Sequence, residues 1–207
     1  MMIAIVDYGL GNLESVKYAL DRLGKDSALT SEPAEIASAD GVILPGVGAF
    51  GVAMDNLRRL GLIEPLRRTA EAGRPLMGIC LGLQLLLEES GEHGRHEGLG
   101  IIPGRVVRFE AGRTIPHMGW NEVRQEREDP LFEGVPDEAF FYFAHSYLTR
   151  PTDPDAAVGS TDYDGRFASM LRRGSVVATQ FHPEKSGPVG LRMLANFAGL
   201  CGREEAT

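Results

Sequence analysis

Three short apolar segments constrain most strongly what this 207-residue chain can fold into. At residues 3–6, 41–44 and 76–80, apolar side chains follow one another without the polar alternation of a half-exposed strand. Such runs are typical of strands that are buried on both faces of a parallel sheet. A stretch with helical spacing of its apolar residues follows the first run, at residues 13–23. The alternation predicts an α/β fold in which helices cover both faces of the sheet.

The remaining segments continue this pattern and then change it. Further helices are expected at residues 54–60, 63–72, 81–88 and 189–200, with a short helix after Pro33 and a weak strand at 27–30. The second half contains candidate hairpin strands at residues 106–109, 121–124, 140–143, 167–171 and 176–181. Asn12 is the expected N-cap of the first helix. We therefore predict one domain over residues 1–201: a three-layer, flavodoxin-like, mostly parallel sheet flanked by helices, with β-rich additions in the second half and a frayed tail at 202–207.

The composition argues against several classes of protein. The net charge is −8 and no basic run occurs, which argues against a nucleic-acid partner. No apolar run approaches the ~20 residues that a membrane span needs, and the N-terminal run is too short for a signal sequence. The two cysteines, Cys80 and Cys201, are far apart in the sequence and suggest no disulfide framework. These features favour a protein of the reducing cytoplasm.

Cys80 lies at the junction of a predicted strand and a predicted helix, with Gly78 and Gly82 two residues to either side. This is the spacing of a nucleophile elbow, with cysteine in place of serine. A helix N-terminus favours a thiolate, and it directs the Leu81 N–H toward a developing oxyanion. The elbow alone is consistent both with a catalytic cysteine and with a small buried core residue. Cys201 has no such surroundings and is expected to be a core residue.

A cysteine nucleophile needs a base and a group that orients the base. His182 and Glu184 lie two residues apart at the predicted end of an apolar strand, so their side chains should leave the strand on the same face. Glu184 would then accept a hydrogen bond from one imidazole nitrogen while the other faces the thiol. A surface His-Pro-Glu at a strand end is one alternative, and a zinc site that includes Cys80 is another. No local pair has the usual zinc-ligand spacing, and we expect neither a metal nor a cofactor.

The stretch PGVGAFG at residues 45–51 fits the G-x-G-x-x-G pattern of a dinucleotide-binding turn. That pattern also requires an acidic residue at the end of the next strand, about 20 residues further on. The candidate, Glu71, lies in a predicted helix instead. The pattern normally opens the first βαβ unit, whereas this loop follows the third predicted strand. A nucleotide-binding or regulatory module is therefore disfavoured.

The stretches GICLGLQ and QFHPEKS resemble the class I, triad-type glutamine amidotransferases. DYGLGNLESV, LPGVGAF, PHMGWN and YFAHSY make the sequence similar to the glutaminase subunits of imidazole glycerol phosphate synthase. The resemblance covers residues 3–197 in the family's order. It implies that L-glutamine is hydrolysed to glutamate and ammonia through a glutamyl thioester on Cys80. His182 would be the acid and base, and Glu184 would orient it.

The same resemblance implies roles for further residues. The backbone N–H groups of Leu81 and Val47 would hold the oxyanion, and the glycines beside Val47 lower the cost of rotating a peptide there. The residues expected to hold glutamine are Gly48, Gln84, Ser146 and Tyr147. Those expected at a partner interface are Asn12, Tyr142 and Lys185. Phe141 and Phe143 are expected in the core.

The resemblance also implies a heterodimer with a (β/α)₈-barrel cyclase subunit, which receives the ammonia through an interior passage. That subunit would make imidazole glycerol phosphate and aminoimidazole carboxamide ribotide in histidine biosynthesis. The glutaminase subunit of pyridoxal phosphate synthase is an alternative with the same fold, and PHMGWN argues against it. A cysteine peptidase of related fold is a second alternative, which would cleave peptides instead of glutamine.

Overall fold

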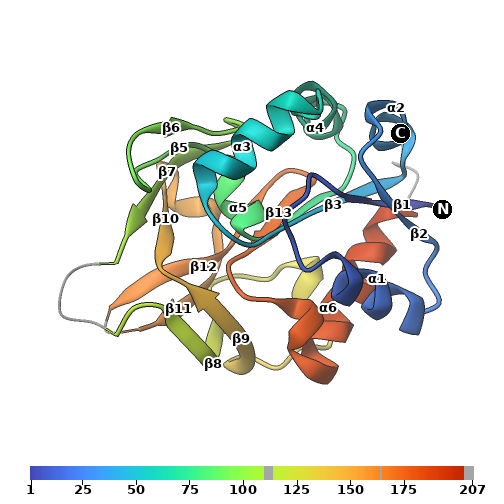
Figure 1. Cartoon of the computed structure of the whole chain (residues 1–207). Coiled ribbons are helices and arrows are strands. Elements are labelled where there is room, and N and C mark those ends of the chain that lie inside the picture. Colours follow the sequence, from blue (N-terminus) through green and yellow to red (C-terminus); the bar gives the residue numbers. More distant parts are fainter. Residues whose placement is uncertain (110–113, 164, 203–207) are drawn as a thin grey trace.

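A computed structural model describes residues 1–109, 114–163 and 165–202. One sheet runs through the molecule in the strand order β2-β1-β3-β4-β13-β12-β10-β7-β5-β6 (Figure 1). Its parallel half consists of β1 (Ile3–Val6), β2 (Ser27–Thr30), β3 (Gly41–Gly46), β4 (Leu76–Cys80) and β13 (Val176–Thr179). The strands predicted from the three apolar runs are therefore confirmed. The tail expected to fray lies, from residue 203 onward, outside the described residues.

Two apolar clusters lie on the two faces of this parallel half. Along β1, Ile3 and Ile5 belong to one cluster, and Ala4 and Val6 belong to the other, because successive side chains point to opposite faces. The first cluster is covered by α1 (Leu13–Arg22) and α6 (Gly187–Cys201). The second is covered by α2 (Pro33–Ser38), α3 (Phe50–Arg59) and α4 (Ile63–Glu71). Figure 1 shows the two groups of helices on opposite sides of β1 and β3, which confirms the three-layer α/β fold.

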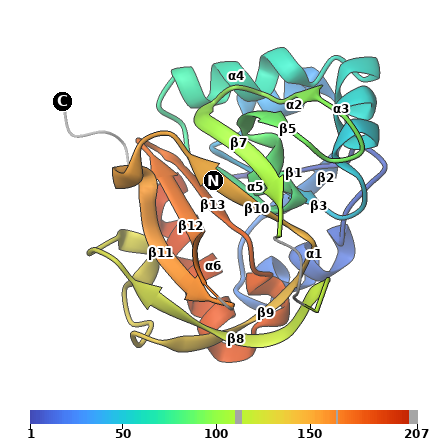
Figure 2. The same ribbon diagram turned by 90° about the vertical axis from the view of Figure 1, so that its left-hand side faces the viewer.

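The second half adds mostly antiparallel strands. The sheet continues through β12 (Arg166–Arg173), β10 (Tyr147–Pro151) and β7 (Ile102–Arg108), and it ends at β5 (Leu87–Ser90) and β6 (His96–Glu97). The strands β8 (His117–Gln125), β9 (Ala139–His145) and β11 (Ala157–Asp162) form a layer beside α6 (Figures 1 and 2). Short 3₁₀ turns occur at Pro130–Phe132, Pro154–Ala156 and Pro183–Lys185. Phe141 and Phe143 on β9 are fully buried, as expected.

The helix predicted at residues 81–88 is wrong in its second half. The helix α5 (Leu81–Leu85) is five residues long, and β5 begins two residues later. The stretch Leu81–Leu87, which includes the polar Gln84, is buried throughout, so it carried no amphipathic signal for either element. Leu87 pairs with Ile102 on β7, and this long-range pairing decides the local structure. The strands β6, β10 and β11 and the first turn of α3 were also missed. No helix among the described residues is long and apolar enough to cross a membrane.

Candidate active site

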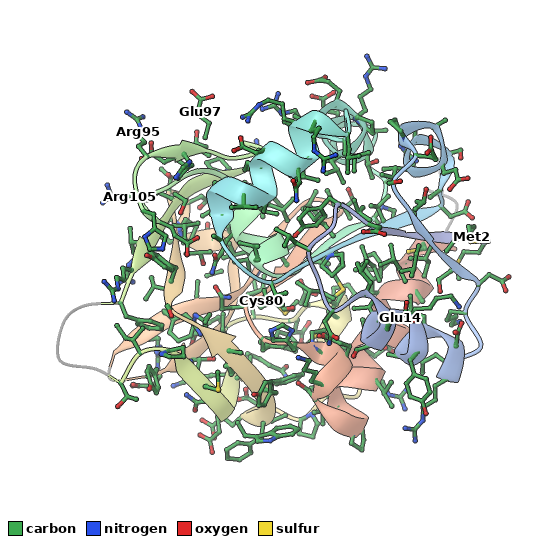
Figure 3. The ribbon with its side chains drawn as sticks, in the orientation of Figure 1. Met2, Glu14, Cys80, Arg95, Glu97 and Arg105 are labelled. Atoms are coloured by element: carbon green, nitrogen blue, oxygen red, sulfur yellow. The ribbon has the colours of Figure 1, made fainter. Side chains whose placement is uncertain are left out.

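Cys80 is the last residue of β4 and directly precedes α5. Its backbone has φ 56° and ψ −108°, a conformation that residues other than glycine rarely adopt. Strain of this kind is typical of functional positions. Figure 3 places Cys80 in the interior of the molecule, and its residue surface is 5% exposed. The elbow expected from the sequence is therefore present in the structure.

The glycines around Cys80 allow backbone to approach backbone. A Cβ on Gly82 would lie 1.8 Å from Leu44 O of β3, and one on Gly78 would lie 2.9 Å from the carbonyl carbon of Gly82. Distances below 3.0 Å to main-chain atoms require the main chain to move. The glycines thus let α5 pack directly on the strand ends, and they fix where the Cys80 sulfur lies.

We expect Gly82→Ala to destabilise the folded chain by at least about 3 kcal/mol, because the new methyl group overlaps the Leu44 carbonyl. Gly199→Ala is the matched control. It lies inside α6, and no described atom outside its own helix backbone and chain neighbours lies within 4 Å of its added Cβ. This control should be neutral or should stabilise the chain by up to about 1 kcal/mol. Denaturant unfolding of the two variants checks this, and equal stabilities would contradict the packing argument.

The side chains of His182 and Glu184 form a buried pair next to Cys80. His182 Nδ1 lies 2.8 Å from Glu184 Oε1, and the two side chains are 2% and 1% exposed. His182 and Cys80 line the same pocket, and the charge of Cys80 acts on the imidazole. Since Nδ1 faces the carboxylate, Nε2 is the nitrogen that faces the thiol. The three side chains expected to act together are therefore brought together by the fold.

The backbone path to this pair differs from the one predicted. β13 ends at Thr179, and His182 precedes the 3₁₀ turn Pro183–Lys185. The expectation that strand alternation puts both side chains on one face is thus wrong. The turn brings Glu184 back to His182 instead, and Ser186 Oγ stabilises it by donating to His182 O at 2.6 Å.

The protonation of His182 is set by opposing effects. Burial lowers the pKa of the imidazole, but the hydrogen bonds with Cys80 and Glu184, together with the charges of these two groups, outweigh burial. They raise the pKa of His182 to about 10. The site therefore favours an imidazolium that can give a proton to a leaving group.

Asn12 does not cap α1, although it stands at the N-cap position. Its Nδ2 donates to Glu184 Oε1 at 3.3 Å, and its Oδ1 accepts from Ser15 Oγ at 2.8 Å. The predicted N-cap position is confirmed, but the side chain makes no capping hydrogen bond, because it is held by Glu184 and Ser15. Glu184 Oε1 thus accepts from both Asn12 and His182, while Oε2 is buried without a partner among the described residues.

A pocket of about 320 Å³ opens in front of Cys80 and His182. It is also lined by Lys185 and by all six residues that the sequence predicted as substrate or oxyanion contacts: Val47, Gly48, Leu81, Gln84, Ser146 and Tyr147. Asn12 and Tyr142 are not among the described lining residues. Lys185 Nζ lies 6.0 Å from the centre of the Tyr142 ring, so these two expected interface residues are neighbours at the pocket edge.

The loop after β3 is anchored by a hydrogen bond at each end and is exposed between them. Gly46 is the register partner of Cys80 across the parallel strands β3 and β4. Before the loop, Tyr8 Oη donates to Pro45 O at 2.9 Å. After it, Phe50 N donates to Glu92 Oε2 at 2.7 Å. Val47 and Gly48 are exposed between these anchors, and Gly48 has φ 101°.

Comparisons with known proteins agree with this geometry. The model of the glutamine amidotransferase class-I family matches residues 4–200. The chain belongs to this family. It is also 52% identical over 206 residues to the imidazole glycerol phosphate synthase subunit HisH of Desulfitobacterium hafniense, covering 100% of this chain and 97% of that one. The HisH subunit of Moorella thermoacetica is 52% identical over 198 residues, covering 96% and 94%. These matches confirm the resemblance that the motifs indicated.

Solved structures support the class-I amidotransferase fold at lower identity. The structure of PurLQS from Thermotoga maritima has a TM-score of 0.78 and 18% identity, covering 96% of this chain and 97% of that one. A crystal structure of a glutamine amidotransferase has a TM-score of 0.75 and 23% identity, covering 95% and 98%. At these identities the likeness concerns the fold alone.

Sequence reasoning missed three residues of this class-I amidotransferase site. Glu92 lines the pocket, but it lies between the predicted elements, in a stretch without a recognised motif. His145 also lines it, and its ring is linked to His117, with His117 Nδ1 3.0 Å from His145 Nε2. Burial lowers the pKa of both histidines, to about 4 for His117 and about 3 for His145, so both are neutral. His117 lies in the motif PHMGWN and His145 in YFAHSY, and these motifs were the sequence signal that could have identified them.

A larger surface hollow lies elsewhere. It measures about 760 Å³ and is lined mainly by charged residues of the β5–β7 edge and of β10, including Arg95, Glu97 and Arg105. Figure 3 shows these three side chains pointing outward at the edge of the molecule, away from Cys80. Because neither cysteine nor histidine lines this hollow among the described residues, it is not the candidate active site.

Proposed function

We propose that this chain hydrolyses L-glutamine to glutamate and ammonia and is the glutaminase subunit of an imidazole glycerol phosphate synthase. The buried Cys80–His182–Glu184 arrangement in front of a pocket carries the proposal. The 52% identity to HisH subunits over nearly the full length of both chains supports the choice of enzyme. The ammonia would pass to a cyclase subunit that makes imidazole glycerol phosphate and aminoimidazole carboxamide ribotide in histidine biosynthesis.

The first chemical step is attack of the Cys80 thiolate on the side-chain amide carbon of glutamine. The imidazolium of His182 gives its proton to the leaving nitrogen, so ammonia departs and a γ-glutamyl thioester remains. The raised pKa of His182 keeps this proton available at neutral pH. Glu184 orients the ring through Nδ1 and stabilises its positive charge.

The second step is hydrolysis of the thioester. Neutral His182 now takes a proton from a water molecule that attacks the acyl carbon, and the Cys80 thiolate leaves as glutamate forms. Each tetrahedral intermediate carries a negative oxygen that needs N–H donors. The Leu81 N–H at the elbow is one donor. The Val47 N–H is the second donor when its peptide is rotated so that this N–H faces Cys80.

The polar groups of the pocket suit the ends of an L-glutamine molecule. Gln84 uses its Nε2 for Tyr147 O and Gln180 Oε1, which leaves its Oε1 to accept from the substrate. Glu92 supplies a carboxylate for the substrate ammonium group. Gly48 and the Ser146–Tyr147 backbone complete the contacts.

The partner would cover the mouth of the pocket. Met118, Trp120 and Phe140 on the outer face of β8 and β9 are 65%, 56% and 53% exposed, and Met118 also lines the pocket. Asn12, Tyr142 and Lys185 belong to the same region in this proposal. Ammonia released under such a cover would be shielded from protonation by bulk water. The two free cysteines agree with the cytoplasmic location that we propose.

We expect the isolated chain to hydrolyse glutamine slowly, and the cyclase complex with its nucleotide ligand to be about 10- to 100-fold faster. The reason is that the loop between Pro45 and Phe50 is exposed at its centre and can be turned inward by a partner. Glutamate release is measured for the chain, the complex and the liganded complex, with a peptide substrate as a control for peptidase activity. Maximal activity of the chain alone would contradict the regulation, and peptide cleavage would favour the peptidase.

A further inference from the structure

Gln180 is a fully buried residue whose side-chain amide contacts the Cys80 sulfur. It lies two residues before His182 in the sequence. Its Nε2 donates to Cys80 Sγ at 3.8 Å, within the range of hydrogen bonds to sulfur. Its Oε1 accepts from Gln84 Nε2 at 3.1 Å, and its backbone N–H donates to Ser169 O at 2.8 Å. Gln180 is absent from the described residues that line the pocket. It therefore contacts the reacting sulfur without lining the pocket that we propose for the substrate.

A backbone carbonyl fixes which way this amide points. Tyr147 O can only accept, and it lies 3.2 Å from the Gln84 amide, so Gln84 must direct its Nε2 toward it. The second hydrogen of that Nε2 is directed at Gln180, which must present Oε1. Gln180 is then left with N–H groups for the sulfur. A reversed amide would put two NH₂ groups together and an oxygen against the sulfur.

We propose that Gln180 is a catalytic hydrogen-bond donor to the Cys80 thiolate, which holds the sulfur in place together with His182 and stabilises its negative charge. This role rests on the proposed function only in taking Cys80 as the nucleophile. The two donors differ in kind. His182 loses its proton to the departing ammonia, whereas the amide N–H of Gln180 is present in every step. Gln180 therefore still donates to the sulfur when the thioester breaks and the thiolate returns.

The test uses two variants of the full chain that both remove the N–H donor. Gln180→Glu keeps the size and the acceptor for Gln84, and Gln180→Met keeps the length without charge. The pH dependence of Cys80 alkylation by iodoacetamide is followed by mass spectrometry of the intact chain, without substrate. Cys201 does not interfere, because burial raises the pKa of its thiol to about 12. Gln125→Glu, which removes an amide donor from the Val135 carbonyl, is the matched control.

We expect the midpoint pH of alkylation to rise by about one unit in both Gln180 variants and to stay unchanged in Gln125→Glu. In the complex, kcat at pH 7 should fall about tenfold in both variants. KM should stay within about twofold in Gln180→Glu, which keeps the acceptor that orients Gln84. An unshifted midpoint in Gln180→Met would overturn the proposal, even if Gln180→Glu shifts, because charge repulsion alone would then explain the change. Since alkylation needs no glutamine, this measurement tests the role of Gln180 even if the chain does not hydrolyse glutamine.

Discussion

Cys80→Ala is expected to reduce glutamate release by the cyclase complex at least about 1,000-fold, because no other group can form the thioester. The sequence has one other cysteine, Cys201, which is buried in α6, and burial raises the pKa of its thiol to about 12. The substitution removes one small side chain, so the complex should still assemble. Glutamate release is measured at saturating glutamine, with complex formation checked by gel filtration.

Cys201→Ala is the matched control for this experiment. It removes the same side chain from the core, far along the sequence from the elbow, and should leave glutamate release unchanged. Full activity of the Cys80→Ala complex would contradict the mechanism outright. Loss of activity in both variants would show that the assay reports stability instead of chemistry.

Glu184→Gln is expected to lower kcat roughly 100- to 10,000-fold with little effect on the fold. Glu184 Oε1 accepts from His182 Nδ1 and Asn12 Nδ2, so the glutamine oxygen must take this position. The new NH₂ group then occupies the place of Oε2, which has no partner among the described residues. The geometry is kept and the negative charge is lost. Any large effect therefore reports the electrostatic role of the carboxylate.

The same variant has a predicted pH dependence. The pKa of His182 is raised from 6.5 to about 10, so pairing of the imidazolium stabilises the folded chain fully below pH 6.5, and this stabilisation is lost as the pH rises toward 10. Removing the charge of Glu184 should lower the pKa of His182. The difference in unfolding free energy between the two proteins should be largest at about pH 6 and should shrink at higher pH. A difference that is constant or grows with pH would contradict the assignment.

The sequence predicted well those parts of the fold whose structure is decided by residues close together in the chain. Continuous apolar runs identified β1, β3 and β4, because strands buried on both faces leave no polar positions. The glycines around Cys80 predicted the elbow, because close backbone contact tolerates no Cβ. Where the cause was not local, prediction was wrong. The stretch after Leu85 leaves the helix because β5 pairs with the distant β7.

The same distinction applies to the candidate site. Cys80, His182 and Glu184 lie in motifs with specific spacing, so they could be named from the sequence. Gln180 lies in one of those motifs, yet its donation to Cys80 spans 100 positions and could not be read from spacing. Glu92 reaches the start of α3 from a loop with no pattern of its own. The Asn12 side chain follows a tertiary contact in preference to its local role as a cap.

The central claim, that Cys80 is the nucleophile of a glutamine pocket, is tested most directly by covalent labelling. The complex is treated with a glutamine analogue in which a chloromethyl ketone replaces the side-chain amide, and the label is mapped by peptide mass spectrometry. We predict one label per chain, on the peptide that contains Cys80, complete loss of glutamate release, and protection by L-glutamine. Loss of activity with the label on another residue, or labelling of Cys80 that glutamine does not slow, would contradict the account.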